Sequence, residues 1–363
     1  MKRNKFYSLL IAAMTLSAAV TVRAQVAIDE TNFPDANFRA VLASDYDTNE
    51  DGILDADELS IRNLVVIGED IADLTGIEHF TALSQLACSS NKLTSLDVSK
   101  NPTLTDLQCS SNQLTSLDLS ANTALTRLSC SDNQLTSLNI TKCTELTFIH
   151  CGNNPLMSID VSKNTALTSL SCVDIGLTSI DVSNNTALTF LACNCNDGRL
   201  GAMNFNKITS LDISKNTELQ TLYCYGLGLT SLDVSKNTAL TNLICYNNLL
   251  TSLDVSQNTA LTGLSCQNNY MANEPIGIDK LTLYSYTFLP QNVSSAVNTV
   301  AATQVWSTGG ALHIRTAAPA DAQIYSIGGA LVKTLTVAGE ATVALPKGAY
   351  IVNVGGVSTV IVL

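Results

Sequence analysis

One stretch near the start of the chain places oxygen-bearing side chains at the spacing of a cation-binding loop. Its six candidate ligands are Asp47, Asn49, Asp51, Ile53 through its backbone carbonyl, Asp55 and Glu58. Oxygens at loop positions 1, 3, 5, 7, 9 and 12 are the donors that a calcium loop presents, and a glycine at position 6 makes its sharp turn. Gly52 stands at that position. The stretch therefore predicts a calcium site with a Kd of about 10⁻⁴–10⁻³ M, as in extracellular modules.

The same stretch matches the EF-hand loop pattern D-x-[DN]-x-[DN]-G-x5-E at every specified position. A helix is expected on each side of it, over residues 29–45 and from Ala56 to Leu64, and Pro34 lies in the first turn of the former. Together these elements predict an EF-hand-like helical cap over residues 25–63. Because EF-hands usually work in pairs and this one stands alone, an Asp-rich turn that only caps the next domain is the alternative interpretation.

Nine of the eleven cysteines recur at a nearly constant interval. They are Cys88, Cys109, Cys130, Cys151, Cys172, Cys193, Cys224, Cys245 and Cys266, spaced by 21 residues except for one step of 31. If these side chains stack on neighbouring strands, their Cβ atoms lie about 4.8 Å apart, more than the ~3.8 Å of a disulfide. We therefore expect small buried hydrophobic residues that are inert as nucleophiles. Outside the row, Cys143 replaces an Asn of a turn, and Cys195 is predicted to be the most exposed thiol.

A second row consists of aspartates that recur in the other half of the same repeat. They are Asp97, Asp118, Asp160, Asp181, Asp212, Asp233 and Asp254. Stacked carboxylates raise one another's pKa or need counterions. The row is interpreted either as hydrogen-bonded turns or as a weak calcium-binding edge. Because no pair of these carboxylates has a distinct environment and the chain has only three histidines, an enzyme is not expected.

Both rows belong to a 21-residue repeat that runs from Leu83 to Gln267, with halves that read L-T-x-L-x-C-x-x-N and L-T-S-L-D-V-S-x-N. In each half the second Leu and the Cys or Val lie two positions apart, so both point inward from a short strand. A fixed period in this range indicates a solenoid, here mainly β and of about nine coils. The predicted repeat domain spans residues 64–272, with rows of Asn at its turns, a worn first repeat at 64–83 and an inserted loop between Cys193 and Cys224.

The outward positions of the cysteine-bearing half vary from coil to coil, whereas the other half barely changes. Apolar and aromatic residues gather at these positions in the second half of the array, and aromatic side chains are typical anchors of interfaces. The candidate ligand-binding residues are Phe148, His150, Phe190, Tyr223, Tyr225, Ile244 and Tyr246. This face is predicted to bind a protein. A glycan stacked on the same aromatics and a purely structural role stiffened by calcium are the alternatives.

Two further segments flank the array. Residues 1–24 have a basic start, an apolar run and a small-residue site before Gln25, which predicts a secretory signal peptide. After a connector at 273–300, residues 301–363 alternate apolar and polar positions between Gly-rich turns, which predicts a small β-sandwich of about six or seven strands. No later stretch reaches the ~20 apolar residues of a membrane span. The net charge of −12 argues against nucleic acid or an anionic membrane as partner.

The pattern L-x-x-L-x-C-x-x-N-x-L, seen from Leu125 to Leu135, resembles the leucine-rich repeat with Cys at one core position. The 21-residue form is similar to the repeats of exported Gram-negative surface proteins, in which an EF-hand-like segment commonly precedes the array. This resemblance implies an adhesin- or internalin-like solenoid that binds proteins, secreted or at the outer cell surface. The segment from Ala311 to Leu363 is similar to C-terminal sorting domains of the type IX secretion system, although it ends without the expected basic residue.

Overall fold

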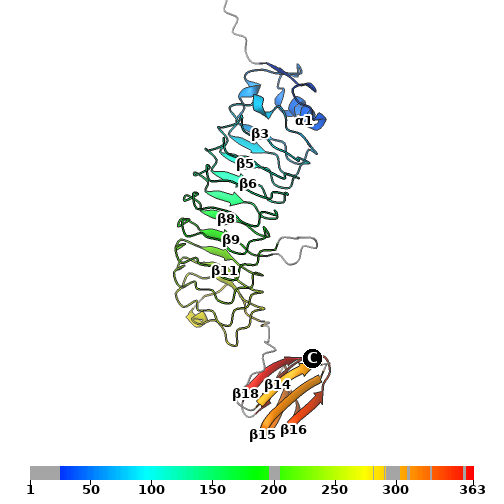
Figure 1. Cartoon of the computed structure of the whole chain (residues 1–363), viewed down its shortest axis with the longest axis vertical. Helices are drawn as coiled ribbons and strands as arrows, with labels where there is room; N and C mark the ends of the chain where they lie inside the picture. The colour runs from blue at the N-terminus through cyan, green and yellow to red at the C-terminus, as the bar shows by residue number, and fades with distance from the viewer. Residues whose placement is uncertain are drawn as a thin grey trace, which may run out of the picture.

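The computed structural model describes residues 25–195, 205–280, 282–289, 291, 303–308, 311–327, 329–354 and 357–363. Along this part of the chain, a small N-terminal cap leads into a stack of short parallel strands, and a separate antiparallel sheet ends the chain (Figure 1). The predicted signal peptide and most of the inserted loop lie outside the described residues. No helix in the described ranges has the length and apolar character needed to cross a bilayer.

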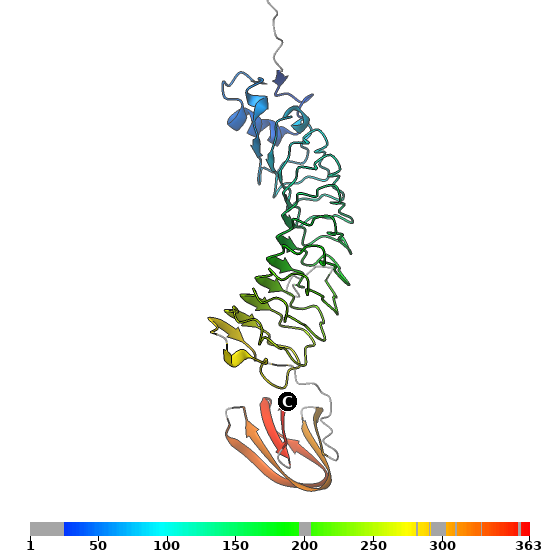
Figure 2. The same cartoon turned by 90° about the vertical axis from the view of Figure 1, so that its left-hand side faces the viewer.

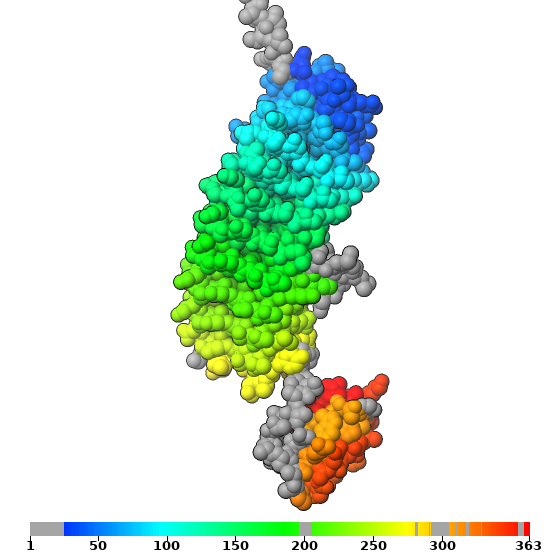
Figure 3. Space-filling model, viewed as in Figure 1, coloured from blue at the N-terminus to red at the C-terminus, as the bar shows by residue number. Residues whose placement is uncertain are grey.

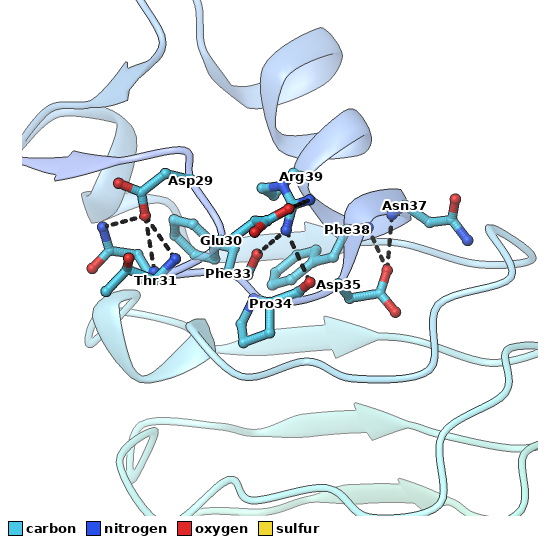
Figure 4. Close-up of polar contacts among 10 residues, drawn as sticks. Asp29, Glu30, Thr31, Phe33, Pro34, Asp35, Asn37, Phe38 and Arg39 are labelled. Carbon is cyan, nitrogen blue, oxygen red and sulfur yellow. Dashed lines mark hydrogen bonds and ion pairs between the residues drawn. The ribbon is translucent and has the colours of Figure 1, made fainter.

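The N-terminal cap is built around one short helix, α1 (Ala36–Val41), which continues as a π-helical turn, η1 (Leu42–Tyr46). Figure 4 shows how its start is fixed: the Asp35 carboxylate accepts hydrogen bonds from the N–H groups of Asn37 and Phe38. Residues 29–35 form a turn in place of the predicted first helical residues, because Asp29 accepts two backbone hydrogen bonds there. The cap also pairs β1 (Val26–Ala27) with β2 (Ile53–Leu54) in antiparallel fashion.

The prediction of a second helix in the cap, from Ala56 to Leu64, is wrong. The structure has a single 3₁₀ turn, η2 (Glu58–Ser60), and the chain then enters its first parallel strand, β3 (Asn63–Val65). The reason is the short distance along the chain between the loop and the array. Strand β3 must pair with β4 (Gln85–Ala87), which leaves room for one turn only.

Within the described residues, the array forms one parallel sheet of eleven three-residue strands. After β3 and β4 these are β5 (Asp106–Gln108), β6 (Arg127–Ser129), β7 (Phe148–His150), β8 (Ser169–Ser171), β9 (Phe190–Ala192), β10 (Thr221–Tyr223), β11 (Asn242–Ile244), β12 (Gly263–Ser265) and β13 (Ser285–Thr287). Figure 2 shows the strands stacked along one side of the array and the turns along the other. The prediction of a mainly β solenoid is confirmed. In addition, 3₁₀ turns η3 (Ile77–His79) and η4 (Ile278–Lys280) lie near its two ends.

Each coil closes around a continuous core of Leu, Val, Ile and Cys side chains. The middle residue of every strand from β3 to β12 is buried, as Leu128 is in β6. The residue that follows each strand is buried with it, Val66 after β3 and a cysteine after β4 to β12. The core cluster extends from Phe33 in the cap to Met271 near the last coil. Since each strand buries its centre only against neighbouring coils, one repeat cannot form a core alone. Figure 3 shows the result as one continuous ridged body.

Two rows of buried Asn side chains hold successive coils together, as predicted. One row follows the cysteines and consists of Asn91, Asn112, Asn133, Asn154, Asn206, Asn248 and Asn269. In it, Asn133 Nδ2 donates to the carbonyls of Cys109 and Cys130, and its Oδ1 accepts from the N–H of Leu114, all at 3.0–3.1 Å. Asn206 was missed in the sequence because it follows the insertion. Gln291 extends the row, since its amide donates to the Cys266 carbonyl at 2.9 Å.

The second Asn row lies at the turns of the other half-repeat: Asn101, Asn122, Asn164, Asn185, Asn216, Asn237 and Asn258, all buried. Asn122 Nδ2 donates to the carbonyls of Val98 and Asn101 at 3.0 and 2.9 Å. Its Oδ1 has no hydrogen-bond partner among the described residues, and the same holds along the whole row. The second row therefore acts through its donors alone, whereas the first uses donor and acceptor.

The C-terminal unit is an antiparallel sheet of β14 (Thr303–Thr308), β15 (Ala311–Ser326), β16 (Leu331–Ala344), β17 (Ala349–Val354) and β18 (Val357–Val362). Two long strands take the place of the four short ones expected, so the described part has five strands instead of six or seven. Strand β15 pairs β14 through its first half and β17 through its second half, and its pairing with β16 has a register shift between Thr316 and Ala320. The two halves share one buried core that includes Leu312, Ile324 and Val352.

Candidate binding face

The strand face is the surface made by the first and third residues of strands β4 to β12. Their backbone groups are held in the parallel ladder, and their side chains point outward on either side of a buried Leu or Ile. Side chains on this surface lie at successive coils in exact register, as Phe190, Thr221 and Asn242 do across β9, β10 and β11. Neighbours in the ladder are about 4.8 Å apart. Residues far apart in sequence thus form one continuous surface.

Aromatic side chains of β9, β10 and the two turns that follow β10 and β11 form the aromatic cluster: Phe190, Tyr223, Tyr225 and Tyr246. The rings of Phe190 and Tyr223 meet edge to face, with centroids 5.6 Å apart and an interplanar angle of 72°. Tyr225 and Tyr246 stack with centroids 4.5 Å apart and an angle of 12°. The Asn242 amide lies 3.5 Å from the Tyr223 hydroxyl, as a donor to it. All four aromatic side chains are half-buried, so their rings are ordered and still accessible.

The surroundings of the stacked pair disfavour a negative charge on Tyr225. Burial, together with the nearby Tyr246, Asp174 and Cys195 groups, raises the pKa of Tyr225 to about 12. Asp174 itself is buried, with 2% of its surface exposed. Burial is the largest of these causes and penalises a charge of either sign, so the shift shows only that the Tyr225 hydroxyl stays protonated.

A second group on the strand face lies over β5, β6 and β7. The Arg127 guanidinium carbon is 4.3 Å from the centroid of the Phe148 ring, and its Nε lies 3.7 Å from an Asp106 carboxylate oxygen. Arg127 therefore has an aromatic ring on one neighbouring strand and a carboxylate on the other. His150 lies on the same strand as Phe148. Burial lowers the pKa of His150, while Asp132 opposes that change.

The seven predicted ligand-binding residues thus fall into two groups. Phe148 and His150 lie on β7, and the other five lie on β9 to β11 or directly after β10 and β11. Strand β8 separates the groups and presents only Ser169 and Ser171 outward. Arg127 and Asp106 were not among the predicted site residues. Their signal in the sequence was a pair of opposite charges at the same repeat position in consecutive coils.

The Asp row forms hydrogen-bonded turns, which confirms the first of its two interpretations. In each case the Asp carboxylate accepts the N–H of the serine two residues on, at 2.8–2.9 Å. The N–H and hydroxyl of that serine lower the pKa of Asp97, Asp118, Asp160, Asp181, Asp212 and Asp233. The net shift is opposite to the rise expected from like charges alone. A shallow groove of about 200 Å³ between two coils is lined by Asp212, Asp233 and Lys236.

All eleven cysteines are buried. Burial raises the pKa of Cys109, Cys151 and Cys193 to about 12, so the reactive thiolate is strongly disfavoured. Cys143 takes the place of an Asn of the second row, as predicted, with its Sγ 3.7 and 3.6 Å from two carbonyl oxygens of the preceding coil. Cys195 is the most exposed of the eleven cysteines, as predicted, but it is still buried, with 5% of it exposed. Its N–H still donates to the Tyr225 carbonyl, which keeps it in the coil.

The loop of residues 47–58 folds as a compact turn held by its own carboxylates. Asp47 accepts from the N–H of Gly52 at 2.8 Å, and Gly52 has the positive φ of 78° that the turn requires. Glu58 accepts from the N–H of Thr48 and of Asp55 at 2.6 and 2.9 Å, which joins the two ends of the loop. Asp47 and Glu58 are each 5% exposed. Throughout the described ranges, however, no three His, Cys, Asp or Glu side chains converge as a metal site.

Comparison with known proteins agrees with the repeat architecture. Residues 123–164 match the family described as Leucine Rich repeats (2 copies). A segment of 70 residues is 39% identical to Internalin J of Listeria monocytogenes serotype 4b (strain F2365), which corresponds to 19% of this chain and 8% of that protein. The chain therefore carries leucine-rich repeats, and over this segment it is similar to a Listeria internalin of which it matches only a small part.

Among solved structures, an internalin (inlF) from Listeria monocytogenes str. 4b F2365 is similar in fold, with 23% identity and a TM-score of 0.58. The alignment covers 74% of this chain and 86% of that one. The functional domain of InlJ from Listeria monocytogenes, which includes a cysteine ladder, aligns with 24% identity and a TM-score of 0.41, over 93% of this chain and 98% of that one.

Proposed function

We propose that this chain is a protein-binding module and that the strand face from β6 to β12 is the surface that receives the partner. The observation that carries the proposal is the aromatic cluster, which gathers four rings on neighbouring coils, two on the strand face and two in the turns directly after β10 and β11. Tyrosine and other aromatic residues supply large contact areas at low entropic cost and are enriched at interface centres. The role is binding rather than catalysis, and an adhesin-like use of the face follows from it.

The positions around the cluster suit an interface as well. The outward residues of β8 and β12 are Ser169, Ser171, Gly263 and Ser265, which are small and uncharged. Small residues let a partner's backbone approach the sheet closely, and the neighbouring rings then enclose the contact. Charged residues are depleted at the centre of protein interfaces, as they are over this part of the face.

Site-specific photo-cross-linking of the full chain tests the proposal. A benzoylphenylalanine at Ser171 on the strand face should cross-link to proteins in a cell-surface extract. The same group at Ser214, on the opposite half-repeat, is the matched control and should give no band. Equal cross-linking from both positions, or none from Ser171, would contradict binding through the strand face. A glycan array probed with the same protein covers the other class of ligand: retention on glycans that is lost in Tyr223→Ala would favour a sugar-binding role instead.

We also propose that the loop of residues 47–58 binds calcium and stiffens the N-terminal cap. Its donor set of carboxylates, an amide and a backbone carbonyl suits a hard cation. Asp47 and Glu58 are nearly buried at the two ends of the loop, and backbone N–H groups already hold both carboxylates there. This loop supplies no chemistry to the strand face.

A calorimetric melting experiment tests the calcium site. Calcium at about 5 mM, above the Kd typical of extracellular modules, should raise the Tm of the protein. Glu58→Gln should abolish the rise, whereas the control Asp57→Asn, which changes a loop carboxylate outside the donor set, should keep it. A Tm that does not respond to calcium in the unaltered protein would refute the site.

The two ends of the chain support a proposal about location. Residues 1–24 would direct export, and the C-terminal antiparallel sheet would act as a sorting or anchoring unit, so that the array is secreted or displayed at the outer cell surface. Cell fractionation of the full chain and of a form without residues 301–363 tests this. Release of the shortened form into the medium would support anchoring, and retention of it inside the cell would support sorting. Unchanged distribution would contradict both roles.

A further inference from the structure

We propose that the aromatic cluster accepts an arginine-bearing segment of the protein partner. The inference rests on the proposed function and deepens it, because it names the chemistry of the group that the strand face recognises. Guanidinium groups stack on aromatic rings and pair with carboxylates, and arginine is enriched at interface centres for both reasons.

The protein itself shows how this face holds a guanidinium group. Arg127 lies on β6 between Phe148 on one neighbouring strand and Asp106 on the other, 4.3 Å from the ring centroid and 3.7 Å from a carboxylate oxygen. A cation within about 6 Å of a ring centroid is attracted by the ring quadrupole. The strand face thus already contains one complete site for arginine, filled by a residue of the chain.

The aromatic cluster repeats the aromatic component of this site on other coils. It supplies rings on β9, on β10 and directly after β10 and β11. The cation is missing from the sequence at the corresponding positions. The outward residues of β8 to β12 are Ser169, Ser171, Phe190, Ala192, Thr221, Tyr223, Asn242, Ile244, Gly263 and Ser265, with no Lys or Arg. None of these strand positions therefore supplies a guanidinium group to the rings, and in the proposal that group is assigned to the partner.

The charge of the chain favours the same kind of partner. The net charge of −12 attracts basic segments over distances of about a Debye length, ~8–10 Å at physiological salt. Long-range attraction would apply equally to lysine, whereas stacking against flat rings favours the planar guanidinium. The Tyr225–Tyr246 pair, with its rings 12° from parallel, presents such a flat aromatic surface. Recognition should therefore rank arginine above lysine, and lysine above a neutral analogue.

Binding of short labelled peptides to the full chain tests the inference by fluorescence anisotropy. The probes are a glycine–arginine heptapeptide with three arginines, its lysine counterpart, and its citrulline counterpart, which keeps the planar shape of arginine without the charge. Tyr225→Leu/Tyr246→Leu removes the rings and leaves the net charge unchanged. Asp212→Asn/Asp233→Asn is the control that removes charge from the opposite half-repeat.

The arginine peptide should bind most tightly, and the tyrosine variant should weaken it about 5- to 10-fold, as expected for the loss of two cation–π contacts. The aspartate control should change the affinity less than 2-fold, since its carboxylates lie on the other half-repeat. Melting curves confirm that both variants fold, and Tyr246→Leu alone serves as the milder change.

Equal affinity for the arginine and lysine peptides, or a loss of affinity in the aspartate variant and none in the tyrosine variant, would overturn the inference in favour of general charge attraction. Absence of peptide binding would also overturn it. That outcome remains distinct from failure of the proposed function, because cross-linking of a protein from Ser171 could persist without arginine recognition.

Discussion

Replacement of one Asn by Cys in each of the two Asn rows should have unequal effects on stability. Asn133 in the row after the cysteines uses both ends of its amide: Nδ2 donates to the Cys109 and Cys130 carbonyls, and Oδ1 accepts the Leu114 N–H. Asn122 in the other row donates to two carbonyls, and its Oδ1 accepts nothing among the described residues. A cysteine thiol can supply a weak donor but only a poor acceptor.

The protein already has a cysteine at one position of the second Asn row, and it shows how a thiol fits there. Cys143 occupies the second row and directs its Sγ at the carbonyls of Leu119 and Asn122, at 3.7 and 3.6 Å. Asn122→Cys repeats that arrangement one coil earlier, and the weakened donor should cost about 0.5–1.5 kcal/mol. Asn133→Cys loses the same donor and also leaves the buried Leu114 N–H without its acceptor, which adds about 1–3 kcal/mol. The first-row variant should therefore be the less stable by about 1–3 kcal/mol.

Urea unfolding followed by circular dichroism measures the difference, with both variants compared with the unaltered chain. Hydrogen exchange of the Leu114 amide gives a local readout, because that N–H loses its partner only in Asn133→Cys. Cys143→Asn is the reciprocal control and should be neutral or stabilising, since it restores the better donor. Equal destabilisation by the two variants, or a greater loss of stability in Asn122→Cys, would refute the reasoning that only the row after the cysteines also uses its amide oxygens as acceptors.

Three further outcomes are expected. A thiol reagent at pH 8 should leave the folded protein largely unlabelled and should react with all eleven cysteines in guanidinium. The reason is that burial raises the pKa of thiols such as Cys109 and Cys151 to about 12. Rapid labelling of the folded protein would contradict this. Burial raises the pKa of Asp35, but hydrogen bonds from four backbone N–H groups together lower it by more, so the net shift of the pKa is downward. Its contribution is therefore present above pH ~4 and lost as the pH falls through the depressed pKa. Asp35→Ala should cost about 1 kcal/mol at pH 7. Asp35→Asn should flatten the pH dependence of the Tm below about pH 4, and an unchanged profile would argue against it. At the exposed Ser111, where φ is 56°, Ser111→Val should lower stability by about 1–2 kcal/mol while Ser111→Gly should not, as measured by urea unfolding.

The periodic part of the fold could be predicted because every coil repeats the same physical problem. Leu128 and Cys130 must be buried and Asn133 must satisfy backbone groups, and the same residue types recur every 21 positions. One requirement was missed. The residue two positions after the row cysteine has a left-handed backbone in most coils: Ser90, Ser111, Asp132, Asn153, Asp174, Gly226, Asn247 and Asn268. Because Ser, Asp, Asn and Gly share this position, the sequence indicates only a polar turn there and not the left-handed conformation that these residues have in common.

The errors lie where the periodicity ends. Cys195 was expected in an exposed insertion, but its N–H continues the ladder to the Tyr225 carbonyl, so the coil remains closed around it. The predicted helix after the calcium-type loop depended on a motif that normally has helices on both sides. Here the first strand begins at Asn63 and allows one 3₁₀ turn. The local sequence pattern predicted the loop, whereas the need to enter the parallel sheet determined the conformation of the residues after it.

Different positions of the repeat meet different structural requirements, which explains why the side chains of the strand face are able to vary and to bind a partner. The requirements of the coil are met elsewhere: burial by the middle residue of each strand and by the cysteine, and hydrogen bonding by the Asn rows and the backbone ladder. The first and third strand residues supply only their backbone to the fold, so Ser171 and Tyr223 can occupy equivalent positions in the same sheet. Phe190 and Tyr223 stand at two such positions, where equivalent coils carry Ser169 and Ser171. The coil does not require an aromatic ring there, and the proposed partner would account for these two.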